Sequence, residues 1–118
     1  YLYENNYDFM KIFREIFFKQ DRDPRLFGEW NSIIDSPESE KVKMTFYPDG
    51  KLLYQIISNE KTQIFNLTFY TKNGLIVSNQ PSKPKEESTR YYFENNYSIL
   101  CLDFDGELTK FIKKSSTE

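Results

Sequence analysis

From residue 41 onward, apolar and polar side chains alternate with a period of two, and this pattern constrains the fold most strongly. In the stretch KVKMTFYPDGKLLYQII (41–57), Val42, Met44 and Phe46 alternate with lysine and threonine. Successive side chains of a strand point to opposite faces, so the alternation predicts a strand with one buried face. The residues PDG at 48–50 favour a tight turn, because proline presets φ and Asp-Gly supplies a left-handed residue. The stretch therefore predicts a β-hairpin.

The same rhythm of strand and turn continues to the end of the chain. Further strand-like segments are QIFNLTFYTKNGLIVS (63–78), STRYYFE (88–94), YSILCLDF (97–104) and ELTKFIKK (107–114), with Asn-Gly and Asp-Gly pairs at turns. With the segment around the tryptophan, they make about eight short strands at a spacing of roughly ten residues. Short hairpin turns favour an antiparallel up-and-down meander that closes into a barrel over 26–113. The expected fold class is mainly β.

Residues 6–20, NYDFMKIFREIFFKQ, predict one N-terminal amphipathic α-helix. Their large apolar side chains recur with the spacing of a single helical stripe, and they are Phe9, Ile12, Phe13, Ile16 and Phe17. We expect this stripe to pack against the barrel or plug its end; the alternative is that it meets a partner. The chain 1–118 is expected to be a single domain with a frayed tail at 114–118.

The only tryptophan, Trp30, lies two residues after Gly28, where the helical pattern gives way to the strand pattern. Glycine lacks Cβ, so the backbone can bend there or approach another segment closely. We expect Trp30 to point inward from the first strand and plug one end of the barrel. A buried indole N–H needs an acceptor, so it is expected to donate to a backbone carbonyl near that end.

Composition argues against several classes of function. The chain has no histidine and one cysteine, Cys101, so it lacks the residues for Ser-His-Asp or Cys-His catalysis, for a disulfide and for a cysteine- or histidine-based metal site. A formal net charge of -2 with interleaved signs differs from the basic stripe of a nucleic-acid binder. We expect no enzyme, cofactor, metal or nucleic-acid partner. No apolar run approaches the roughly 20 residues of a membrane span.

Strand alternation assigns a set of large side chains to the barrel interior. An eight-stranded barrel is either filled by side chains or just wide enough for one small ligand. The 11 Phe and 9 Tyr residues favour the filled interior. The predicted lining of a cavity, should there be one, is Trp30, Met44, Phe46, Tyr54, Phe65, Leu67, Phe69, Tyr92, Leu100, Leu102 and Phe111.

The longest loop, NQPSKPKEE (79–87), is where we first expect a protein-binding surface, since loops on a rigid scaffold often carry recognition. The candidate residues in and beside this loop are Lys83, Lys85, Arg90 and Tyr91. Tyrosine is a frequent anchor of protein interfaces.

A family resemblance rests on two features. Gly28-x-Trp30 at the start of the first strand, followed by a meander, resembles the lipocalin and lipocalin-like (calycin-type) barrels. The segment YYFENNYSILCLDFDGELTKFIK (91–113) is similar to the last three strands of small bacterial lipocalin-like proteins of uncharacterised function. The resemblance covers about Leu26 to Lys113 and implies an up-and-down barrel with a cavity for a small apolar ligand. The chain departs from secreted animal lipocalins in having no disulfide and a helix that comes first.

The resemblance favours a non-enzymatic lipocalin-like binding protein whose barrel holds a small apolar or amphipathic ligand. The alternative is a filled barrel that binds a protein through its loops and N-terminal helix, as a bacterial immunity or inhibitor protein would. A histidine-free enzyme is the least favoured hypothesis. The compartment stays open between the cytoplasm and, if an export signal preceded Tyr1, the periplasm or a lipoprotein.

Overall fold

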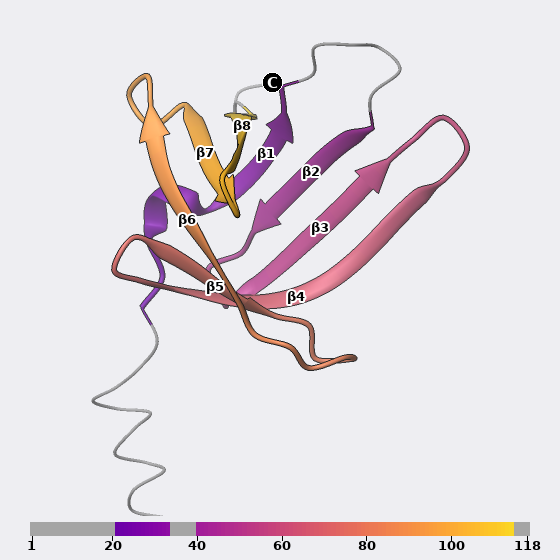
Figure 1. The fold of residues 1–118 in the computed structure, drawn as a ribbon, viewed down its shortest axis with the longest axis horizontal. Coiled ribbons are helices and arrows are strands. Elements are labelled where there is room, and N and C mark those ends of the chain that lie inside the picture. The colour runs from indigo at the N-terminus through magenta and orange to yellow at the C-terminus, as the bar shows by residue number, and fades with distance from the viewer. Residues whose placement is uncertain (1–20, 34–39, 115–118) are drawn as a thin grey trace, which may run out of the picture.

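The computed structural model describes residues 21–33 and 40–114, and these form a short 3-10 helix followed by eight strands (Figure 1). The elements in chain order are η1 (Pro24–Leu26), β1 (Gly28–Ser32), β2 (Lys41–Phe46), β3 (Lys51–Ile57), β4 (Thr62–Lys72), β5 (Leu75–Asn79), β6 (Glu87–Glu94), β7 (Ile99–Phe104) and β8 (Glu107–Lys113). No helix among these described residues is long and apolar enough to cross a membrane.

Each strand pairs antiparallel with the next, and β8 pairs back with β1, so the sheet is a closed barrel in the order β1 to β8. At the closure Trp30 lies opposite Lys113 and Asn31 opposite Ile112. Closure leaves no strand edge unpaired. The predicted mainly β, eight-stranded antiparallel up-and-down barrel is confirmed, and it is compatible with a lipocalin-like fold.

The hairpin turns lie where the sequence predicts them. The PDG, Asn-Gly and Asp-Gly signals fall between β2 and β3, between β4 and β5, and between β7 and β8. Gly50 has φ +98, a conformation that side chains with a Cβ rarely adopt, and the Arg22 guanidinium lies where a Cβ would point. The turn between β6 and β7 is less ordinary: Asn95, Asn96 and Tyr97 all have positive φ, at 52, 56 and 63.

Two expectations concern the ends of the chain. The helix predicted over 6–20 lies outside the described residues, as do residues 115–118. The predicted tail begins at Lys114, which is the last residue that the structure describes. Its backbone N–H donates to the Glu29 carbonyl at 2.9 Å and so continues the pairing of β8 with β1.

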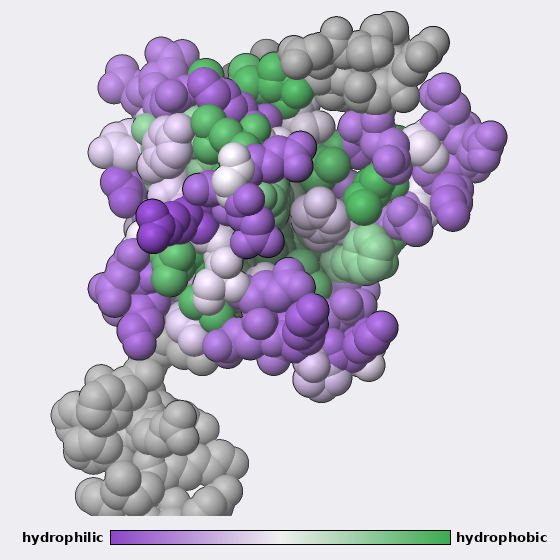
Figure 2. All heavy atoms as spheres, in the orientation of Figure 1, coloured by the Kyte–Doolittle hydropathy of each residue, from purple (hydrophilic) through white to green (hydrophobic). Residues whose placement is uncertain are grey.

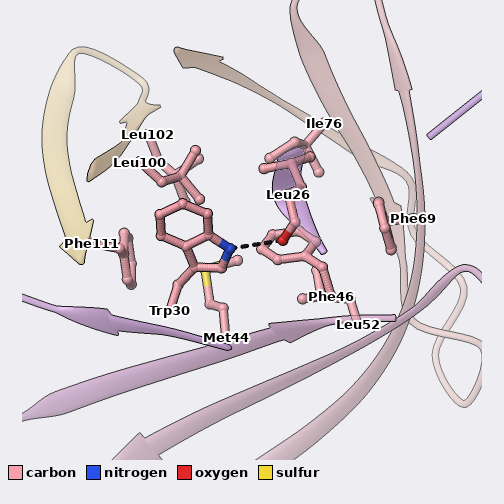
Figure 3. Packing of buried hydrophobic residues seen from close by; sticks show 10 residues of the cluster. All are labelled: Leu26, Trp30, Met44, Phe46, Leu52, Phe69, Ile76, Leu100, Leu102 and Phe111. Atoms are coloured by element: carbon pink, nitrogen blue, oxygen red, sulfur yellow. Dashed lines mark hydrogen bonds between the residues drawn. The ribbon is translucent and has the colours of Figure 1, made fainter. Parts of the chain in front are cut away.

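One end of the barrel interior is packed around Trp30, which is fully buried (Figure 3). Its Nε1 donates to the Leu26 carbonyl at 2.8 Å, which confirms the expected backbone acceptor. Gly28 has φ +119, so the chain bends there to carry η1 beneath the indole. Lys113 Nζ lies 5.3 Å from the centroid of the Trp30 ring, within cation–π range. The buried cluster comprises Leu26, Trp30, Met44, Phe46, Leu52, Phe69, Ile76, Leu100, Leu102 and Phe111.

Replacing the central indole should cost more stability than removing an exposed side chain of similar hydrophobicity. Trp30→Ala leaves a cavity in the core and strips the Leu26 carbonyl of its donor, and we expect a loss of about 3–5 kcal/mol in the free energy of unfolding. Ile64 is 56% exposed on the outside of β4, so Ile64→Thr should change it by less than about 0.5 kcal/mol. Chemical denaturation followed by circular dichroism measures both; equal losses would contradict this account of the core.

Candidate ligand-binding cavity

The barrel interior is filled at one end and hollow at the other. The hollow is a cavity of about 300 Å3, and Met44, Leu52 and Leu102 separate it from the packed end. Figure 2 shows one hollowed face with hydrophobic residues in its depth and hydrophilic residues around it. The full lining is Met44, Leu52, Tyr54, Ile56, Phe65, Leu67, Ile76, Ser78, Glu87, Thr89, Leu102 and Phe104. Ile56 and Ser78 lie near the ends of β3 and β5 and Glu87 begins β6, so the cavity opens beside the β5–β6 loop.

The predicted lining residues divide between the cavity and the packed end. Met44, Tyr54, Phe65, Leu67 and Leu102 line the cavity. By contrast, the set Trp30, Phe46, Phe69, Leu100 and Phe111 is in the packed cluster and none of its members lines the cavity. The barrel interior is therefore filled by side chains at the end around Trp30 and open at the other end.

Tyr92 is the one predicted interior residue that the structure places outside. It is 47% exposed and lies opposite Cys101, while Tyr91 and Phe93 on either side of it pack against the core. The prediction was wrong because it overlooked the flanking charges: Arg90 and Glu94 share a face with Tyr92 in an alternating strand, so Tyr92 belongs on the outside. The inward positions of β6 are instead Thr89, Tyr91 and Phe93.

Several lining residues were missed by the sequence analysis. Leu52 and Ile56 follow from the same alternation that gives Tyr54 and were recoverable. Ser78, Thr89 and Glu87 are polar, and alternation assigns polar side chains to the solvent side. They contribute a polar strip from β5 and β6 that faces apolar walls from β3 and β4. Burial raises the pKa of the Tyr54 hydroxyl on the apolar side, so this wall carries no charge at neutral pH.

A charged cluster seals the packed end. Arg25 donates from Nε to Asp23 Oδ1 at 2.9 Å and from Nη2 to Asp23 Oδ2 at 2.8 Å. The Tyr91 hydroxyl also donates to Asp23 Oδ2, at 2.8 Å. The Arg25 guanidinium also lies 5.2 Å from the Phe93 ring centroid and 4.9 Å from that of Tyr97. The aromatic and ionic contacts together hold η1 across the barrel end.

The pKa values in this cluster follow from the hydrogen bonds. The bond from Arg25 holds the pKa of Asp23 below its usual value. Burial, and secondarily the bond to Asp23, raise the pKa of Tyr91 to about 12. Tyr91 therefore acts as a neutral donor in the floor of the barrel.

The four residues predicted to form a protein-binding surface are not brought together. Lys83 and Lys85 lie in the loop at the open end, and Arg90 is exposed on the barrel wall. Tyr91 faces the interior at the closed end, where Asp23 holds its hydroxyl, so its predicted surface position is wrong.

The single thiol lies on the other side of the wall from the cavity. Cys101 is fully buried and sits opposite Tyr92 and Lys110 in the sheet register, and Lys110 is paired with Glu94 at 2.9 Å. Burial raises the pKa of the Cys101 thiol, so it stays protonated at neutral pH. Among the described residues, no group of three histidine, cysteine, aspartate or glutamate side chains could hold a metal ion.

A scan of protein-family models and searches of curated proteins and of solved structures found no match to this chain.

The charge on Asp23 should stabilise the fold in a defined pH range. Because its pKa is lowered on folding, its contribution is complete above the unfolded value, near 4, and is lost as pH falls through the folded value. Asp23→Asn keeps an N-cap acceptor but removes the charge, and we expect it to cost about 1–2 kcal/mol at pH 7. This difference from the wild type should shrink below about pH 4 in denaturation measured by circular dichroism.

Asp49→Asn is the matched control, since Asp49 meets Lys51 only at 3.7 Å and its side chain is 58% exposed. It should have little effect at any pH. A difference between wild type and Asp23→Asn that stayed constant down to pH 2 would show that the charge is not what holds η1.

Proposed function

We propose that this chain is a non-enzymatic binding protein, a small bacterial lipocalin-like barrel whose cavity takes a small apolar or amphipathic molecule. The observation that carries the proposal is the cavity of about 300 Å3 above a packed floor. Ligand pockets in proteins are typically about 300–1,000 Å3, mostly apolar, with a few placed polar groups. A cavity at the lower end of this range suits a compact or short-chain ligand.

The distribution of polarity around the cavity supports an amphipathic ligand. Its apolar wall includes Leu52, Ile56 and Phe65, which would exclude water from a hydrocarbon body. Ser78 and Thr89 on the facing wall offer hydroxyls that can donate to or accept from a polar group. The packed cluster beneath the cavity supplies a rigid floor.

The test is a cavity-filling variant with its neighbour as the control. Thr89 lines the cavity, whereas Ser88 is exposed and points the other way along β6. Binding of the neutral fluorescent dye N-phenyl-1-naphthylamine should be saturable in the wild type. We expect Thr89→Phe to weaken it at least about tenfold, since one occluded apolar contact is worth about 1.5–3 kcal/mol, and Ser88→Phe to leave it unchanged.

Two results would contradict the proposal. One is an absence of dye binding to the folded wild-type chain across a broad panel of neutral apolar probes. The other is equal binding by Thr89→Phe and Ser88→Phe, which would place the dye outside the barrel. Circular dichroism on both variants separates a blocked cavity from a failure to fold.

A protein-binding role is the second candidate, and one observation favours it. The outer face of the barrel at the β1–β8 closure carries Ile33, Leu108 and Ile112, which are 48%, 47% and 50% exposed. Ile112 also lies opposite Ile99 of β7. Large apolar side chains gathered on an exposed face are typical of protein contacts.

The chain offers a matched pair to test the second candidate. Ile112→Lys should abolish capture of a specific protein from the source cell in a pull-down, because a lysine ammonium would be desolvated in the contact. Ile64→Lys, on the outside of β4, should preserve it. Equal capture by both variants would contradict a role for the β1–β8 face.

A further inference from the structure

A second hollow adjoins the cavity at its open end, and it is polar. It has a volume of about 260 Å3 and shares Leu67, Ser78 and Glu87 with the apolar cavity. Its remaining walls come from the β5–β6 loop, including Lys83 and Lys85. The two hollows therefore adjoin along the three shared residues, with the apolar one further inside and the charged one further outside.

The backbone of the β5–β6 loop is held in place beside this second hollow. The Lys85 N–H donates to the Asn79 side-chain oxygen at 2.8 Å, and the Lys83 N–H donates to the Gln80 carbonyl at 3.0 Å. Both bonds lie within the loop that lines the hollow. They fix the positions from which the two lysine side chains start, so the ammonium groups are presented at the mouth of the barrel.

The charged side chains that line the polar hollow are two lysines and one glutamate, while Glu86 of the same loop does not line it. Lys85 Nζ is 3.9 Å from Glu87 Oε1, and these side chains are 80% and 65% exposed, so the pair is weak. Lys83 forms no ion pair within the part of the chain that the structure describes. Two ammonium groups against one carboxylate favour an anion here, and a carboxylate on the ligand can draw Lys85 away from Glu87 at little cost.

We propose that the polar hollow receives the anionic head group of an amphipathic ligand whose apolar part lies in the cavity, and that the ligand class is a short-chain or medium-chain carboxylate. This inference rests on the proposed function. It assigns Lys83 and Lys85, which the sequence analysis placed on a protein-binding loop, to the recognition of a small molecule instead. Glu87, at the boundary of the two hollows, opposes the anion and limits its affinity.

The experiment compares decanoate with decanol, which share a chain length and differ in the head group. Each displaces N-phenyl-1-naphthylamine from the folded full chain at low ionic strength. We expect decanoate to bind about tenfold more tightly than decanol, as two charge-assisted contacts at an exposed site would give. That preference should disappear in Lys83→Gln/Lys85→Gln and persist in Lys72→Gln/Lys114→Gln, which removes the same charge from two exposed residues that line neither hollow. Glu87→Gln should strengthen decanoate binding.

The outcomes separate the two proposals. If decanoate and decanol bind equally, or if both lysine pairs reduce the preference alike, the head-group site is overturned while the apolar cavity stands. If neither compound binds and the dye does not bind either, the cavity proposal fails together with this one. A preference that survives the loss of Lys83 and Lys85 also overturns the head-group site. Raising the salt concentration should weaken decanoate and leave decanol unchanged.

Discussion

The pairing of β8 with β1 is the constraint on which the rest of the molecule depends. It joins residues from the two ends of the described chain and turns an open ribbon into a closed wall. Only a closed wall has an inside, so the burial of Trp30 and the existence of the cavity both follow from this one seam. Trp30 and Lys113 lie opposite each other in the seam and stack, and Lys114 extends it by one more backbone bond to Glu29.

The interior above that seam divides into two parts with different physical roles. At the packed end, η1 brings Leu26 under the indole, and the Asp23–Arg25–Tyr91 cluster holds the helix there. At the open end, side chains from β5 and β6 become shorter and more polar, and the volume they leave is not filled. Most of the tight packing therefore lies at one end of the barrel, and the other end keeps an open cavity.

The sequence predicts the local parts of this structure well and the long-range parts less well. Turns at 48–50, 73–74 and 105–106 were predictable because each depends on two or three adjacent residues whose φ preferences are strong. The acceptor for the Trp30 N–H was predictable because a buried donor requires one. Both features follow from chemistry within a few residues of chain.

The depth of each side chain in the barrel was not predictable in this way. The phase of β6 was recoverable, because Arg90 and Glu94 share a face with Tyr92 and leave Tyr91 and Phe93 to the core. Phe69 lies in the packed cluster, whereas Phe65 lines the cavity. This difference depends on the stagger between strands, which the alternation of side chains does not encode. The cavity lining also includes Ser78, Thr89 and Glu87. They were missed because the alternation rule assigns polar side chains to the solvent face of a strand.

The burial of Cys101 gives the barrel a built-in reporter of its own motion. It is the only thiol in the chain, it is fully covered, and it sits in the middle of β7 opposite Tyr92. An alkylating reagent can reach its sulfur only when the side chains that cover it on the outer face, which include Tyr92 and Lys110, move aside. The rate of labelling under native conditions thus reports how often that movement exposes the sulfur, without any dye, tag or substitution.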